Sequence, residues 1–159
     1  MCRLGGIAMD VEILKAQHRR IIRLGSALGG LAEILKTQDD ASRARELMTA
    51  LNAALIEHLA IEDGELYPVL LRSDDPSVRQ LAEDYVDDMG AVSGAWAHYF
   101  DEWSQARILS DRRRFATASK GLIGALAHRV AREDDTLYPA MEAADARSSS
   151  MKGGAVGAS

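Results

Sequence analysis

The segment EHLAIEDGELYP (residues 57–68) carries a histidine and a glutamate one helical turn apart and ends in Leu-Tyr-Pro. Later in the chain, AHRVAREDDTLYP (residues 127–139) again carries a histidine, a glutamate, further acids and Leu-Tyr-Pro. The two prolines are 71 positions apart, and the histidines His58 and His128 are 70 positions apart. The segments therefore define an internal repeat, and each half of it carries polar side chains at corresponding places.

The sequence around both segments has helical periodicity. Apolar positions in the first part recur every third or fourth residue, at Val11, Leu14, Ile21, Gly25, Leu28, Ala32 and Leu35. This spacing is typical of the buried face of an amphipathic helix. His18 falls where the stripe skips an apolar residue, and Asp88 interrupts a similar stripe over residues 78–99. Polar side chains are thus expected on faces that pack inward.

Breaks in the periodicity divide the chain into four helices. They lie at residues 37–42, at Ser73-Asp-Asp-Pro76 and near Asp111. Helix-forming residues dominate, and no alternating run of β-branched residues predicts a strand. Four long helices with short connections predict an all-α, up-down-up-down antiparallel four-helix bundle. Pro68, close to the end of the second helix, is compatible with a kink there.

The bundle is expected to span residues 10–145. Residues 1–9 are interpreted as a flexible N-terminal extension, too short for a signal peptide, and Met9 is an alternative start of translation. Residues 146–159 are small and polar, so we expect a disordered C-terminal tail.

Charge and composition exclude several classes of partner. The net charge is −5, which does not favour nucleic acid or an anionic membrane surface. No apolar run approaches the roughly 20 residues of a membrane span. The single cysteine, Cys2, excludes an internal disulfide and a cysteine-based metal site. A cytoplasmic location is expected.

The polar side chains of the helices are predicted to lie at one height in the bundle. A helix rises about 1.5 Å per residue, so residues at equal distances from an antiparallel turn are level. Measured from the predicted turns, five side chains fall in one layer: His18, His58, Glu62, His128 and Glu133. Buried groups of this kind are normally paired or bound to metal. Imidazole and carboxylate donors without thiolate suit iron, manganese or zinc.

The spacing of the donors bears on the number of metal ions. His58 and Glu62 are four residues apart, so both can reach one centre. His128 and Glu133 are five residues apart, about 140° around the helix axis, and would bracket a pair of ions better than share one. Two ions are therefore expected. A histidine–glutamate hydrogen-bond network without metal is the rival interpretation.

This constellation resembles the hemerythrin-like (HHE cation-binding) family over about residues 10–143. The similarity rests on His18 in AQHRRI and on the two segments that lead from a histidine and a glutamate to Leu-Tyr-Pro. The family's last ligand pair has the same spacing as His128 and Glu133. The resemblance implies two irons, bridged by Glu62 and Glu133, with the histidines as terminal ligands. It also implies binding or sensing of dioxygen, nitric oxide or iron, or decomposition of peroxide.

The third helix departs from the family's pattern, which commonly has one or two histidines there. This chain reads Asp87-Asp88-Met89. A thioether is a poor ligand for iron(III), so Met89 is expected to pack. Asp88 and Tyr85 are the weaker candidates for the missing ligand. More anionic ligands would favour the oxidised metal, and so sensing, redox or peroxide chemistry over reversible oxygen carriage. A single iron stays open as an alternative.

Two other functions stay open beside metal binding. One is a metal-free or mononuclear helical module that binds a partner through a face near Trp96 and Trp103. The other is an enzyme with peroxide-decomposing or oxidase turnover, for which no acid–base residue stands out apart from the ligands. A homodimer is also left open. His98 and Glu102 repeat the His-x-x-x-Glu spacing but lie far from the layer, so they are interpreted as a surface pair.

Overall fold

The computed structural model describes residues 10–153, and within them the chain is helical apart from short connections. The predicted all-α class is confirmed, and no strand occurs in this part of the chain. The predicted N-terminal extension, residues 1–9, lies outside the described residues. The elements in order are α1 (Val11–Ile34), α2 (Gln38–Ile61), η1 (Glu62–Leu66), α3 (Tyr67–Leu71), α4 (Pro76–Glu102), α5 (Gln105–Ser110), α6 (Arg112–Arg132), η2 (Glu133–Leu137) and α7 (Tyr138–Gly153).

Side chains of the connections fix where the long helices begin. The Asp10 carboxylate accepts a hydrogen bond from the first turn of α1. Thr37 and Asp40 form a capping box at the start of α2, where each side chain accepts from the other residue's backbone N–H. Asp75 caps α4, and Pro76 takes the first helical position, where its missing N–H has no partner to lose.

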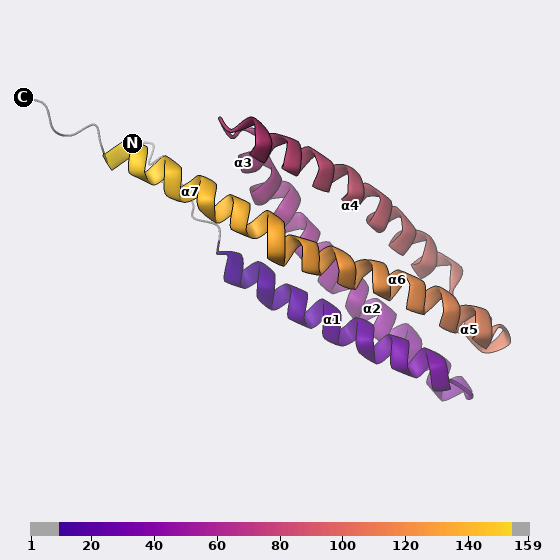
Figure 1. Cartoon of the computed structure of the whole chain (residues 1–159). Helices are drawn as coiled ribbons and strands as arrows, with labels where there is room; N and C mark the ends of the chain where they lie inside the picture. The colour runs from indigo at the N-terminus through magenta and orange to yellow at the C-terminus, as the bar shows by residue number, and fades with distance from the viewer. Residues whose placement is uncertain (1–9, 154–159) are drawn as a thin grey trace, which may run out of the picture.

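The long helices α1, α2, α4 and α6 run alongside one another (Figure 1). Helix α1 contacts both α2 and α6, and α4 contacts α3 and α6. Glycines let α1 approach α6 closely: a Cβ atom on Gly29 would lie only 3.3 Å from Ile123 Cδ1. The helices thus enclose a common interior.

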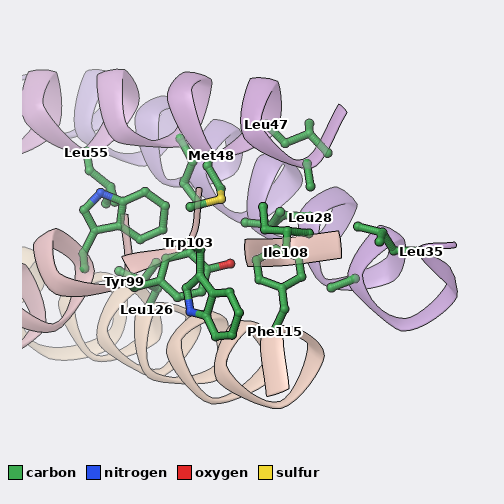
Figure 2. Close-up of a cluster of buried hydrophobic side chains, with 14 of the residues drawn as sticks. Leu28, Leu35, Leu47, Met48, Leu55, Tyr99, Trp103, Ile108, Phe115 and Leu126 are labelled. Carbon is green, nitrogen blue, oxygen red and sulfur yellow. The ribbon is translucent and has the colours of Figure 1, made fainter. Parts of the chain in front are cut away.

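That interior contains two apolar clusters. In the larger one, Leu28 from α1, Met48 from α2 and Phe115 from α6 pack around Trp103, which follows α4 (Figure 2). The smaller one, near the other end, includes Leu14 and Tyr85. His18 follows Leu14 by one turn and precedes the first α1 residue of the larger cluster. The predicted polar layer therefore separates the two clusters.

Two π-helical turns interrupt otherwise α-helical stretches. The first, η1, is followed by Pro68, and the second, η2, by Pro139. Proline cannot donate to the carbonyl four residues earlier, and its ring clashes with that carbonyl in a regular α-helix. A wider turn just before each proline relieves this conflict. The irregularity that Pro68 allowed in the second helix is therefore a π turn.

The C-terminal helix is longer than the sequence predicted. Where a disordered tail was expected from residue 146, α7 continues to Gly153. Met141 anchors the beginning of α7 in the smaller apolar cluster, and the Arg147 side chain pairs with Asp75 at 3.3 Å. These contacts connect α7 to the rest of the fold at residues 141 and 147. Residues 154–159 lie outside the described residues. Across residues 10–153, no helix has the length and apolar character that crossing a membrane requires.

Candidate metal centre

Four side chains from α1, α2, η1 and η2 meet between the two apolar clusters. They are His18, His58, Glu62 and Glu133, and each offers a ligand atom within 4.8 Å of the others. All four are at most 3 % exposed. Both glutamates are the first residues of the π turns, and π turns occur frequently at functional sites. The structure thus brings together four of the five residues of the predicted layer.

The imidazole Nε2 atoms face the centre of this cluster. The Nε2 atoms of His18 and His58 are 3.1 Å apart. His18 Nε2 lies 2.8 Å from Glu133 Oε2, and His58 Nε2 lies 3.3 Å from Glu62 Oε1. The Tyr138 hydroxyl donates to Glu62 Oε1 at 3.2 Å and is also 3.2 Å from His18 Nε2. Both histidines therefore aim the same ring atom at one point.

The opposite ring atoms are held by residues outside the cluster. His18 Nδ1 lies 2.9 Å from Asp134 Oδ1, and His58 Nδ1 lies 2.9 Å from Gln17 Oε1. Both partners are acceptors, so both Nδ1 atoms donate, and each ring in its neutral form presents a lone pair at Nε2. Two lone pairs 3.1 Å apart repel unless a cation, a proton or a metal ion, lies beside them. Anchoring of Nδ1 by an acceptor is also the usual arrangement of metal-binding histidines.

Burial and neighbouring charges act on the pKa values of the cluster. Burial raises the pKa of Glu62, against the opposing effect of its hydrogen bond with His58. Burial would also raise the pKa of Glu133, but hydrogen bonds with His18 and His58 and the charge of Arg129 lower it. Burial disfavours the His58 imidazolium, yet Glu133 and Glu62 outweigh this and raise its pKa to about 9. The cluster as a whole attracts a cation.

The donor set fits a metal ion. Two imidazoles and two carboxylates suit iron, manganese or zinc. Glu62 Oε2 is buried and has no hydrogen-bond partner among the described residues. A buried carboxylate oxygen without a partner is costly, and coordination to a metal would satisfy it.

Arg129 lies directly beside the cluster and is 5 % exposed. Its Nε donates to Glu133 Oε1, its Nη1 donates to the Tyr85 carbonyl at 3.0 Å, and its Nη2 donates to the Tyr67 hydroxyl at 2.7 Å. The guanidinium also lies over the Tyr85 ring, 4.7 Å from the centroid. This buried cation contacts Glu133, one of the four clustered residues, and the sequence interpretation did not identify it.

His128 is not part of the cluster, in contrast to the prediction. Its side chain is exposed, and the neighbouring Arg129 faces inward. The reason is helical register: Glu133 shares a helix face with the residue four positions earlier, and that residue is Arg129. The internal repeat also indicates that Arg129 faces inward. A shift of 71 residues, which aligns the two prolines, aligns His58 with Arg129 and not with His128.

The weaker candidates on α4 also lie outside the cluster. Asp88 is exposed and pairs with Arg132 at 2.8 Å. Tyr85 is buried, but its hydroxyl donates to the Arg132 carbonyl at 2.9 Å. His98, from the second His-x-x-x-Glu pair, has a side chain that is 81 % exposed. None of the three reaches the centre.

These features define a class: a helical protein with a buried histidine–glutamate cluster able to hold a metal ion. Residues 9–146 match the family described as the hemerythrin HHE cation binding domain. The match covers most of the chain, and the protein belongs to this family. Comparison with curated proteins and with solved structures found no match.

Proposed function

We propose that this protein binds iron through His18, His58, Glu62 and Glu133, and that the iron binds or senses dioxygen, peroxide or nitric oxide. The observation that carries the proposal is the pair of Nε2 atoms 3.1 Å apart, with their Nδ1 atoms anchored by acceptors. Membership of the hemerythrin family supports iron as the metal. The site lies within a fold that we interpret as an up-down-up-down four-helix bundle.

The chain's own residues have distinct roles in this proposal. His18 and His58 are neutral donors, and the two glutamates are the anionic ligands that offset the charge of the ion. Bound iron would supply a redox-active centre that can exchange a small ligand. The Tyr138 hydroxyl donates to Glu62 Oε1 at 3.2 Å and so orients this carboxylate beside His18 Nε2, which is also 3.2 Å from the hydroxyl.

The surroundings restrict what reaches the centre. Apolar clusters on both sides exclude bulk water and so strengthen electrostatic interactions with the ion. A surface depression of about 270 Å³ between α1 and α6 is lined by His18 and Asp134. Its position makes it the expected route for a small ligand to the buried histidines.

Metal binding tests the proposal directly. The purified protein is loaded anaerobically with iron(II), separated from free metal and analysed for iron. Wild-type protein is expected to retain iron, and H58A to lose it. The matched control is H98A, because His98 is an exposed histidine in a His-x-x-x-Glu pair outside the cluster. Equal iron in H58A and wild type, or none in wild type, would contradict the proposal.

Ligand binding is tested on the loaded protein. Nitric oxide added without oxygen is expected to change the visible absorption spectrum of the iron-loaded wild type and of H98A. The same addition to H58A is expected to leave the spectrum unchanged. An iron-loaded wild type that responds to neither nitric oxide, dioxygen nor peroxide would refute the gas and peroxide part of the proposal while leaving metal binding intact.

A further inference from the structure

The two halves of the internal repeat differ at the positions of the two histidines. A shift of 71 residues aligns Glu62 with Glu133, and also Tyr67 with Tyr138. The same shift aligns the two histidines of the first half with residues that are not histidine: His18 with Met89 and His58 with Arg129. The first half therefore carries both imidazoles, and the aligned positions of the second half carry a methionine and an arginine.

The guanidinium is held as firmly as the histidines are. Each of its three nitrogen atoms donates a hydrogen bond, to Glu133, to the Tyr85 carbonyl and to the Tyr67 hydroxyl. The two tyrosines belong to α4 and to α3, so partners from separate helices converge on Arg129. The packing of these helices therefore fixes the position of the Arg129 side chain.

Glu133 connects the histidines to this guanidinium. Its Oε2 lies 2.8 Å from His18 Nε2 and 3.6 Å from His58 Nε2, and its Oε1 accepts from Arg129. The Glu133 carboxylate therefore contacts two places where a positive charge can lie, one at each of its oxygen atoms. The histidines define the first position, and Arg129 fills the second.

We propose that the Arg129 guanidinium takes the place of a second metal ion, so that the centre binds one ion per chain. This inference rests on the proposed function and departs from the two irons that the sequence predicted. A guanidinium is permanently charged and has no lone pair to offer, so it repels a nearby ion and cannot ligate it. The repulsion is strong because the site is buried. Met89, in the place of the other imidazole, is a poor ligand for oxidised iron.

The inference is tested by the number of iron ions bound per chain. Wild-type protein is loaded anaerobically with excess iron(II), separated from free metal, and its iron is counted per chain. About one iron per chain is the expected result. About two would overturn the inference and leave the proposed function standing. None would overturn the proposed function itself, and the inference with it.

A pair of variants tests the role of Arg129. M89H/R129H introduces imidazoles at the two positions that align with His18 and His58, and this variant is expected to bind a second ion. The matched control R129K keeps a positive charge and is expected to stay at one ion. A double variant with wild-type helical content that still binds one ion would show that Arg129 is not what excludes the second. If the double variant fails to fold, the wild-type count decides alone.

Discussion

Replacing Arg129 by methionine should destabilise the metal-free protein strongly. R129M keeps much of the side chain's length but removes the charge and the three hydrogen bonds to Glu133, the Tyr85 carbonyl and the Tyr67 hydroxyl. The Glu133 carboxylate, 1 % exposed, then stays buried without the guanidinium that pairs with it. Removing one partner of a buried ion pair costs about 3–5 kcal/mol.

That cost is large enough to measure by urea unfolding. Small domains have a free energy of unfolding of about 5–15 kcal/mol, and its slope in urea is about 1–3 kcal/mol per M. A loss of about 4 kcal/mol then lowers the midpoint by about 2 M. Circular dichroism of the metal-free protein follows the loss of helix, and an unchanged slope shows that the compactness of both states is preserved.

Arg132, one turn further along α6, gives the matched control. Its side chain is 41 % exposed and pairs with Asp88, which is 50 % exposed. An exposed pair contributes about 0–1 kcal/mol, so R132M should move the midpoint little. The reasoning about the buried guanidinium is refuted if R129M and R132M unfold at the same urea concentration. Bound iron should reduce the difference between the urea midpoints of R129M and wild type, because the charge of the ion also compensates the Glu133 carboxylate.

Three further predictions concern the metal centre. H128A should keep the iron content of wild type, and its free energy of unfolding should change by no more than about 0.5 kcal/mol, because His128 is exposed. A loss of iron as large as that in H58A would mean that His128 is a ligand after all. D134N should weaken metal affinity about 10–100-fold in a competition titration, because Asp134 anchors His18 Nδ1. The control is D135N at the exposed neighbour Asp135, which should keep the affinity of wild type. Free iron at 100 times its dissociation constant should stabilise the fold by about 2.7 kcal/mol, so the melting temperature should rise with iron and fall back with chelator. Identical melting curves would mean that the folded state has no preference for iron.

The height of the site could be predicted from the sequence, but the direction of one side chain could not. Distance from a turn sets height at about 1.5 Å per residue, so an error of one residue hardly matters. Rotation around the helix axis changes by about 100° per residue, so the same error exchanges inside for outside. His128 and Arg129 illustrate this, since the exposed histidine and the buried arginine are adjacent. Only the strict 71-residue alignment of the prolines separates them.

Arg129 was also missed because arginine is seldom fully buried. Its burial depends on partners that are not adjacent in the sequence: Tyr67 and Tyr85 on other helices, and Glu133 one turn ahead. Tyr85 was a weaker candidate for a ligand, and in the structure its carbonyl and ring contact the guanidinium instead. A single sequence does not show the contacts with Tyr67 and Tyr85, because they arise only when the helices pack.

The charge balance of the cluster supports the proposal that the centre holds one ion per chain. Glu62 and Glu133 bring two negative charges when ionised, and Arg129 compensates one of them. A single divalent ion then leaves one net positive charge in the buried layer, whereas two such ions beside the guanidinium would leave three. The stability of R129M and the iron count of wild type test separate parts of this balance. A strongly destabilised R129M together with two irons in wild type would mean that Arg129 compensates Glu133 but does not limit the metal.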